Sequence, residues 1–217
     1  VGVRVVVPGA AGGQFGELID DGSALAAYRS ALELPELEVV GLHTHLNGSI
    51  STLDELDCLL DGVLDFADTL ERELALSLEI LDLGGNLACP TVTRRSRGGT
   101  RLARALGRDE EPDEAAGRVD VDAYVARASR RVTEHFGRRG EAAPRIFLEP
   151  GRAMTANTQL LLCSVAQVRD PDHAGVTWAV LDAGINVAEA LRSEHHHLFP
   201  VRERAGEAPI VHRLVGP

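Results

Sequence analysis

Short apolar segments of this chain run directly into loops of glycine and polar residues, and helical patterns lie between them. The three stretches are residues 39–49, 78–86 and 145–152, and each is an apolar strand that ends in a loop with glycine, serine, asparagine, histidine or charged residues. A short, nearly continuous apolar run is typical of a strand buried in a parallel sheet. In a barrel of such strands the loops at the carboxyl ends carry the chemistry, so the repetition predicts one shared site.

The order of the expected elements predicts an α/β fold. We expect strands over residues 1–7, 37–45, 78–83 and 146–148, separated by helices over residues 23–34, 52–76 and 121–136. A repeated strand–helix unit implies parallel strands joined by right-handed crossovers. The pattern fits a (β/α)8 barrel or an open doubly wound sheet. Four such units cannot close an eight-stranded barrel, so a barrel also implies residues before Val1.

The pattern changes after Arg152. Residues 160–168, 177–181 and 210–215 are strand-like and have no helical pattern between them, which predicts a second, all-β domain. We therefore expect one domain over residues 1–155 and the start of another over residues 156–217. Residues 94–117 are polar, first basic and then acidic, and we expect them to form a surface excursion.

Composition restricts the function classes. The net charge of −11 argues against a nucleic-acid-binding surface, and no apolar run approaches the length of a membrane span. Three cysteines without metal-type spacing suggest reduced thiols in a cytoplasmic protein. All 22 basic residues are arginine, and the chain starts and stops in what look like strands. We therefore expect a piece of a longer protein, in which any catalytic lysine lies outside these residues.

The loops after the third and fourth expected strands have phosphate-binding character. Backbone N–H groups at Gly84, Gly85 and Asn86 can approach phosphate oxygens closely, and Gly151-Arg152 adds further donors and a positive charge. The alternative is that each loop is a plain turn and that Arg152 is a surface cation. Their occurrence at successive strand ends favours phosphate.

Glu149 follows an apolar run and precedes a proline, so we expect it to be partly buried and paired. A carboxylate that faces a pyridine nitrogen keeps that nitrogen protonated and makes the ring an electron sink. The alternative is a structural ion pair with an arginine such as Arg4.

His43 and His45 alternate along a strand, so both side chains point to the same face. They could be a metal-binding pair, an imidazole stacked on a cofactor ring, or core histidines satisfied by neighbours. The hydroxyl and backbone donors of Gly48-Ser49 favour an anion over a metal. Residues 194–197 could bind metal adventitiously, and no later ligand set completes a site with His43 and His45, so metal ranks second.

Taken together, these motifs resemble those of the fold-type III pyridoxal-phosphate decarboxylases, which include the diaminopimelate, ornithine and arginine decarboxylases. The matching segments are Gly41-Leu42-His43-Thr44-His45 with Gly48-Ser49, Leu81-Asp82-Leu83-Gly84-Gly85, Glu149-Pro150-Gly151-Arg152, Asp182-Ala183-Gly184 and Gly216-Pro217. The resemblance implies the carboxyl half of an alanine-racemase-like (β/α)8 barrel, followed by the start of a C-terminal β-domain.

The resemblance also implies roles for these residues. His45 would stack on the pyridine ring of pyridoxal 5'-phosphate, and Glu149 would contact the ring nitrogen. The residues implied to hold the phosphate are Gly48, Ser49, Gly84, Gly85, Asn86, Gly151 and Arg152. Glu194 falls where ornithine-type members keep an acidic residue that faces the distal amine of the substrate.

By the same resemblance, the intact protein is a homodimer that decarboxylates a basic or dicarboxylic α-amino acid. The Schiff-base lysine would precede Val1 and a cysteine–aspartate pair from the second protomer would follow Pro217, so this segment alone should be inactive. Three positions depart from the family pattern: Asn47 lengthens the serine loop by one residue, Asn86 replaces a third glycine, and Gln14 replaces a lysine. A metal-dependent barrel hydrolase using His43 and His45, and a non-catalytic homologue, remain alternative hypotheses.

Overall fold

The computed structural model describes residues 1–9, 14–46, 49–85, 87–88, 119–155, 158, 160–171, 176–187, 199–201 and 212–216. The chain divides into two compact units. The first contains Val1–Pro90 and Gly117–Asn157, and the second contains Thr158–Pro217. The expected boundary between residues 155 and 156 stays a prediction, and the expected surface excursion over residues 94–117 lies outside the described residues.

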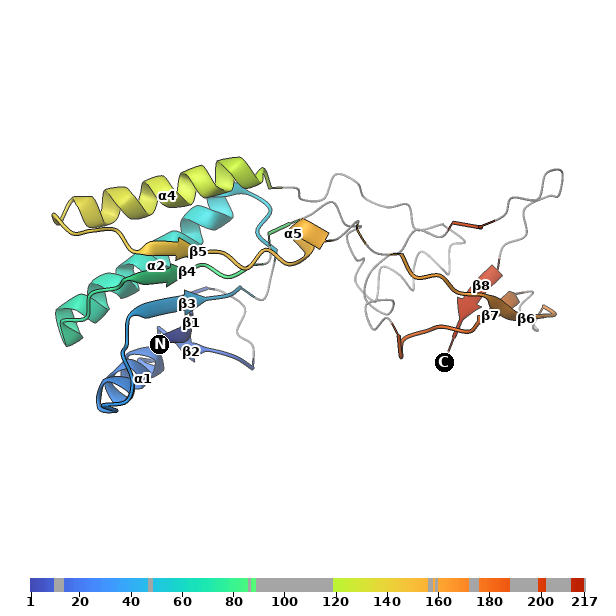
Figure 1. Ribbon diagram of the computed structural model, residues 1–217, viewed down its shortest axis with the longest axis horizontal. Coiled ribbons are helices and arrows are strands. Elements are labelled where there is room, and N and C mark those ends of the chain that lie inside the picture. Colours follow the sequence, from blue (N-terminus) through green and yellow to red (C-terminus); the bar gives the residue numbers. More distant parts are fainter. Residues whose placement is uncertain are drawn as a thin grey trace. The chain divides into compact units, whose positions relative to one another are not determined.

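A parallel sheet forms the centre of the first unit (Figure 1). Its strands follow the spatial order β2-β1-β3-β4-β5, and every neighbouring pair is parallel. The strands are β1 (Gly2–Val6), β2 (Glu17–Leu18), β3 (Gly41–Thr44), β4 (Ile80–Asp82) and β5 (Arg145–Phe147). The predicted α/β class and the four expected strands are therefore confirmed.

The observed strands are shorter than the apolar runs that predicted them. The segment expected over residues 37–45 pairs only from Gly41 onward, where the backbone comes into register with Gly2 of β1. Strand β2 was not expected, because its two residues are exposed and carry no alternating pattern. It forms because Glu17 and Leu18 pair with the last residues of β1.

Three helices of the first unit match the predicted ones, with ends that differ by at most two residues. They are α1 (Ser23–Leu32), α2 (Leu53–Leu74) and α4 (Val121–Gly137). A capping box starts α2: the Thr52 hydroxyl accepts from the Glu55 N–H at 3.2 Å, and the Glu55 carboxylate accepts from the Thr52 N–H at 3.0 Å. None of the described helices has the combination of length and apolar character that a membrane crossing requires.

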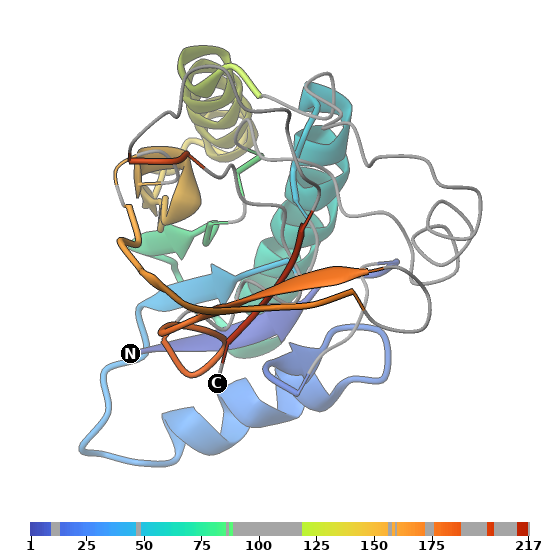
Figure 2. The same cartoon turned by 90° about the vertical axis from the view of Figure 1, so that its right-hand side faces the viewer.

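Helices α2 and α4 lie side by side (Figures 1 and 2) and combine an apolar contact with a row of ion pairs. The basic residues of this row, on α4 and just after its end, recur at every fourth position and so share one face. The ion-pair row consists of Arg127 with Asp57, Arg131 with Asp57 and Asp61, His135 with Asp68, and Arg139 with Asp68 and Glu71. Hydrogen bonding to Asp61 raises the pKa of Arg131, so this guanidinium stays charged at any ordinary pH.

Two buried tyrosines, Tyr28 on α1 and Tyr124 on α4, sit in the core with different hydrogen bonding. The Tyr28 hydroxyl donates to the carbonyl oxygen of Gly41 at 2.8 Å and so ties α1 to β3. The Tyr124 hydroxyl is buried and has no hydrogen-bond partner in the described part of the chain. Burial raises the pKa of Tyr124 to about 12 and raises that of Tyr28 as well.

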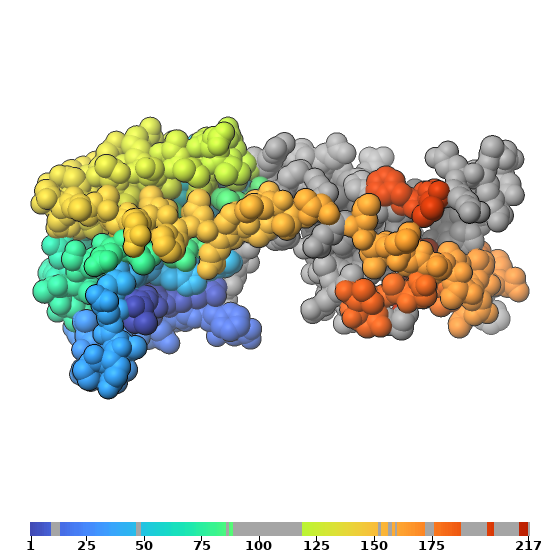
Figure 3. Space-filling view, in the orientation of Figure 1, coloured from blue at the N-terminus to red at the C-terminus, as the bar shows by residue number. Residues whose placement is uncertain are grey.

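Strand β5 pairs with β4 alone among the described residues and so lies at an edge of the sheet. Its Phe147 side chain is 46% exposed. Beside it, α4 and β5 line a shallow apolar groove with residues that include Val125, Val132, Pro144 and Ile146. The surface formed by α4 and β5 runs from yellow-green to gold in Figure 3.

The second unit contains a three-stranded sheet, coloured from orange to red in Figure 2. Strand β7 (Thr177–Leu181) pairs antiparallel with β6 (Val165–Arg169) and parallel with β8 (His212–Val215). This sheet agrees with the strand-rich pattern expected after Arg152. Residues 160–164 are not part of β6, although their apolar character suggested a strand.

Candidate active site

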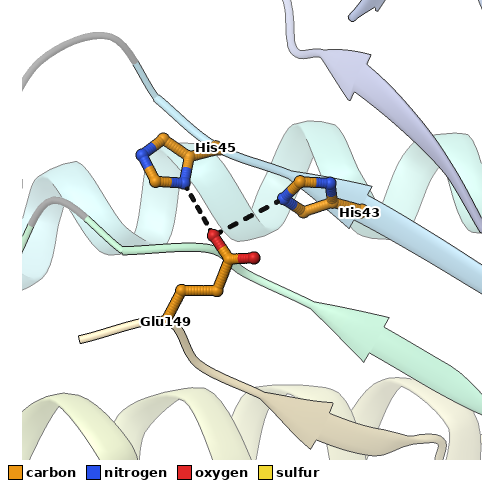
Figure 4. Close-up of side chains that lie close together, drawn as sticks. All are labelled: His43, His45 and Glu149. Carbon is orange, nitrogen blue, oxygen red and sulfur yellow. Dashed lines mark hydrogen bonds and ion pairs between the residues drawn. The ribbon is translucent and has the colours of Figure 1, made fainter. Parts of the chain in front are cut away.

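Two imidazoles and one carboxylate converge where β3 and β5 end (Figure 4). His45 Nδ1 lies 2.9 Å from Glu149 Oε2, and His43 Nε2 lies 3.9 Å from the same oxygen. The two rings stand nearly at right angles, with centroids 6.4 Å apart. His43 and His45 therefore share a face of the strand, as their alternation predicted.

The glycines after β4 explain how Glu149 reaches His45. Strand β4 lies between β3 and β5, so side chains on its loop would stand between the two groups. A Cβ atom at Gly84 would lie 2.5 Å from the Thr44 carbonyl oxygen, and one at Gly85 would lie 2.3 Å from the Glu149 carbonyl oxygen. Only residues without a Cβ allow this close approach.

Backbone hydrogen bonds fix the same loop. The Glu149 N–H donates to the Gly84 carbonyl oxygen at 2.8 Å, which extends the pairing of β4 with β5 past the end of both strands. The Gly84 N–H donates to Asp82 Oδ1 at 2.9 Å, and Gly84 has a left-handed φ of 69°. The conformation of this glycine pair is therefore fixed by specific hydrogen bonds next to the site.

His45 Nδ1 has two hydrogen-bonding neighbours. It lies 2.9 Å from Glu149 Oε2, and its role as donor or acceptor in this contact follows the tautomer of the ring. The Gly85 N–H also points at Nδ1, but at 3.4 Å this contact is weak. In contrast, His43 Nε2 is buried and has no hydrogen-bond partner among the described residues. The imidazole of His45 therefore contacts the carboxylate, whereas His43 keeps one ring nitrogen without a hydrogen bond in this part of the chain.

Arg4 supports the site from β1, where it is the register partner of His43. Its Nη2 donates to the His45 carbonyl oxygen at 3.0 Å, and its guanidinium carbon lies 5.5 Å from the Phe15 ring centroid. An ion pair between Arg4 and Glu149 was one sequence-based alternative. The structure instead pairs Glu149 with the two imidazoles, and Arg4 holds the backbone that carries His45.

The other predicted site residues are distributed as follows. Ser49 is exposed and directly precedes Ile50, which forms a parallel bridge with Leu87 and so joins the loops that follow β3 and β4. Gly151 is exposed, and Arg152 begins the short helix α5 (Arg152–Thr155), where a loop was expected. The positions of Gly48, Asn86, Glu194 and the Arg152 side chain lie outside the described residues.

Sequence reasoning missed two relationships at this site. It proposed no ligand to accompany His43 and His45, yet Glu149 lies beside both. It also treated Arg4 as a partner for Glu149 and not as a support for His45. A lone arginine within the β-branched run of residues 1–7 was the available signal for the second relationship, because a buried guanidinium requires acceptors.

Comparison with known families identifies the larger group to which this site belongs. Residues 4–156 match the pyridoxal-binding domain of the pyridoxal-dependent decarboxylases. The chain belongs to this family. The matched residues include His43, His45, the glycine pair and Glu149, so the clustered side chains all lie in the part of the chain that the match covers.

Several of the relatives that this chain matches are diaminopimelate decarboxylases. The enzyme of Pseudomonas aeruginosa is 31% identical over 206 residues, which cover 94% of this chain and 41% of the relative. The enzyme of Archaeoglobus fulgidus is 28% identical over 195 residues, which cover 88% of this chain and 40% of the relative. The chain thus spans about 40% of the length of these relatives.

Solved structures agree on the fold. The lysine decarboxylase of Selenomonas ruminantium superposes with a TM-score of 0.65 at 19% identity and covers 99% of this chain and 49% of that one. The Helicobacter pylori diaminopimelate decarboxylase, complexed with L-lysine, gives a TM-score of 0.63 at 19% identity, over 100% and 48% of the two chains. The fold of this chain is therefore the carboxyl half of an alanine-racemase-like barrel, followed by part of a β-domain.

Proposed function

We propose that the intact protein catalyses the pyridoxal-phosphate-dependent decarboxylation of a basic or dicarboxylic α-amino acid, of the diaminopimelate or ornithine type. The observation that carries the proposal is the contact of His45 with Glu149 above the Gly84–Gly85 loop. An imidazole and a carboxylate can contact a pyridine ring, and a closely approaching backbone can contact its phosphate.

The residues present fit this cofactor. Side chains are absent at Gly84 and Gly85, where a Cβ would collide with the backbone at Thr44 and Glu149. The Glu149 side chain is 47% exposed, so its carboxylate can turn toward a ring that enters beside His45. The Gly84 N–H donates to Asp82, whereas the Gly85 N–H makes only a weak 3.4 Å contact with His45 Nδ1 and would be the backbone donor of this loop for phosphate. The chemistry that pyridoxal phosphate supplies when bound is the delocalisation of the electron pair released with CO2.

Each group on this chain then has a separate task. Glu149 would hold a proton at the pyridine nitrogen, and His45 would cover one face of the ring and keep it oriented. Gly48, Ser49, Gly84, Gly85, Asn86, Gly151 and Arg152 would hold the phosphate. Arg4 fixes the backbone of His45 through its 3.0 Å hydrogen bond. The lysine that attaches the cofactor must come from residues outside this chain, since none of the 22 basic residues is a lysine.

The substrate and the assembly are further parts of the proposal. The relatives named above act on diaminopimelate or lysine, and both molecules carry a second amine. Glu194 would face such a distal amine. We also propose a cytoplasmic homodimer with its site at the interface, and a domain boundary between residues 155 and 156.

The test is made on the intact protein. Addition of pyridoxal phosphate should produce a visible absorption band, and borohydride reduction should fix the cofactor on one lysine that peptide mass spectrometry can identify. Release of CO2 from a panel of diaminopimelate, lysine, ornithine and arginine would define the substrate. Cofactor binding without turnover of any amino acid would favour the non-catalytic alternative, and failure to bind the cofactor would contradict the proposal.

A metal-dependent hydrolase remains the second candidate, because the ligand atoms of His43, His45 and Glu149 lie within 4.8 Å of one another. Stoichiometric zinc that is required for turnover of a hydrolysable substrate would support it. The family to which the chain belongs favours the decarboxylase.

A further inference from the structure

The cluster of His43, His45 and Glu149 has the composition of a zinc site as well as of a cofactor site. Zinc in proteins binds imidazole nitrogen and carboxylate oxygen, and two histidines with one glutamate is a set it uses when one position stays open. The three ligand atoms here lie within 4.8 Å of one another. In a tetrahedral site with bonds of about 2.0–2.1 Å, neighbouring ligand atoms lie about 3.3 Å apart.

Two of the three distances between ligand atoms bracket this value. His45 Nδ1 and Glu149 Oε2 are 2.9 Å apart, and His43 Nε2 and Glu149 Oε2 are 3.9 Å apart. Figure 4 shows both nitrogens directed at the same carboxylate oxygen of Glu149. A small opening of the His45–Glu149 contact and a small closing of the His43–Glu149 contact would bring these two pairs to the tetrahedral distance, and the two nitrogens lie within 4.8 Å of each other.

His43 provides an independent observation that points to a ligand. Its Nε2 atom is buried and makes no hydrogen bond within the described part of the chain, an arrangement that costs free energy unless the atom gains a partner. Glu149 Oε2 lies 3.9 Å from it, which is too distant for a hydrogen bond. A cation between the two would pair both groups.

The surroundings hold the ligands in place without blocking the open position. His43 lies within β3, where pairing with both β1 and β4 fixes its backbone. Arg4 holds the backbone of His45 by donating to its carbonyl oxygen at 3.0 Å. The partly exposed Glu149 side chain leaves room for a water molecule as the fourth ligand.

We propose that the protein without cofactor binds one Zn²⁺ through His43 Nε2, His45 Nδ1 and the Glu149 carboxylate. Pyridoxal phosphate and Zn²⁺ then exclude each other, because both require His45 and Glu149; this exclusion, unlike the zinc site itself, rests on the proposed function.

The experiment uses the intact protein freed of pyridoxal phosphate. His195, His196 and His197 are replaced by glutamine in every sample, because a run of histidines binds metal on its own. Zn²⁺ is measured by elemental analysis after dialysis, and Co²⁺ is used as a coloured substitute for titration. We expect one metal ion per chain from the described cluster and an affinity at least about 10-fold lower after His43→Ala or Glu149→Gln.

A matched control separates the site from histidine content in general. His135 also pairs with a carboxylate, Asp68, but belongs to the α2–α4 ion-pair row, so His135→Gln should leave the affinity for Zn²⁺ unchanged. Circular dichroism of each variant checks that the fold is kept. Glu149→Gln replaces a half-exposed side chain by one of equal size and should not disturb folding.

The possible results distinguish the zinc site, the mutual exclusion and the proposed function. Failure to bind Zn²⁺, or equal binding by wild-type protein and both site variants, overturns the zinc site. Equal binding of Zn²⁺ before and after saturation with pyridoxal phosphate overturns the exclusion. Zinc binding by a protein that takes up no pyridoxal phosphate supports the zinc site and contradicts the proposed function instead.

Discussion

His45 Nδ1 and Glu149 Oε2 lie 2.9 Å apart, although 104 positions separate the two residues in the chain. Three parallel strands make this contact possible. β3 delivers the imidazole, β5 delivers the carboxylate, and the loop after β4 contributes two glycines that leave the space between them free. The contact joins the two groups that the decarboxylase proposal assigns to one face and to the nitrogen of the same pyridine ring.

Replacement of Glu149 by glutamine should lower kcat of the intact enzyme by about 10²–10⁴-fold, because an amide cannot hold a proton at the pyridine nitrogen. Steady-state kinetics with the preferred amino acid would measure this loss. Glu141→Gln is the matched control, since Glu141 pairs only with Arg139 among the described residues. A Glu149→Gln enzyme with unchanged kcat would remove Glu149 from the mechanism.

Replacement of Gly85 by alanine should destabilise the protein by about 1–3 kcal/mol, because the new Cβ would lie 2.3 Å from the Glu149 carbonyl oxygen. Cofactor affinity should fall as the Glu149 loop moves away from His45. Urea unfolding and a pyridoxal-phosphate titration report the two effects. Gly137→Ala is the control: a Cβ there contacts nothing within 4 Å, so that variant should be at least as stable as the wild type.

The two buried tyrosines should respond oppositely to loss of the hydroxyl. Tyr124→Phe removes a buried hydroxyl without a partner and should be neutral or stabilising at pH 7, whereas Tyr28→Phe removes a 2.8 Å hydrogen bond and should cost about 1 kcal/mol. Urea unfolding at pH 7 measures both. Equal destabilisation by the two substitutions would contradict the difference in their hydrogen bonding.

The raised pKa of Tyr124 predicts that the free energy of unfolding depends on pH in the alkaline range. Burial raises the pKa of Tyr124 to about 12 in the folded state, against about 10 when unfolded, so the unfolded state loses its proton first. The ionisation of Tyr124 therefore leaves the free energy of unfolding unchanged below pH 10 and lowers it as the pH rises toward 12. The difference in unfolding free energy between wild type and Tyr124→Phe should therefore shift in favour of phenylalanine across this range.

Thr52→Ala should cost about 1 kcal/mol, because it removes the side-chain acceptor of the capping box that starts α2. Thermal or urea unfolding would measure the loss. Thr69→Ala, within the same helix, is the control, because its exposed hydroxyl donates to the Asp65 carbonyl oxygen one turn earlier and accepts a weak 3.4 Å contact from Arg72, but caps no backbone N–H. Equal effects of the two substitutions would show that the cap contributes nothing specific.

The sequence predicted the elements better than it predicted their ends or their contacts. Apolar runs such as Leu78–Leu83 mark buried strands whatever their neighbours are, and the stripe on α2 follows from its helical spacing. Pairing is decided by a second strand, however. Residues 37–40 therefore look like a strand and are not one, and the exposed β2 carries no pattern that periodicity could detect.

At the site, too, the features that depend on one strand were predicted and those that depend on neighbouring strands were not. The alternation of His43 and His45 fixed their common face, because that depends on one strand alone. Their approach to Glu149 depends on the spatial order of β3, β4 and β5 and on the space left at Gly85. Local patterns contain no information about that order. The resemblance to a known family, which draws on complete barrels, supplied the expectation that these residues meet.

The edge position of β5 has a practical consequence for any laboratory that expresses residues 1–217 alone. Among the described residues the outer side of β5, beside the exposed Phe147, has no strand partner, and such an edge offers a template on which another chain can add a strand. Self-association of such a truncated sample would report this bare edge and not a physiological assembly. Size measurements on the fragment therefore cannot substitute for those on the complete polypeptide.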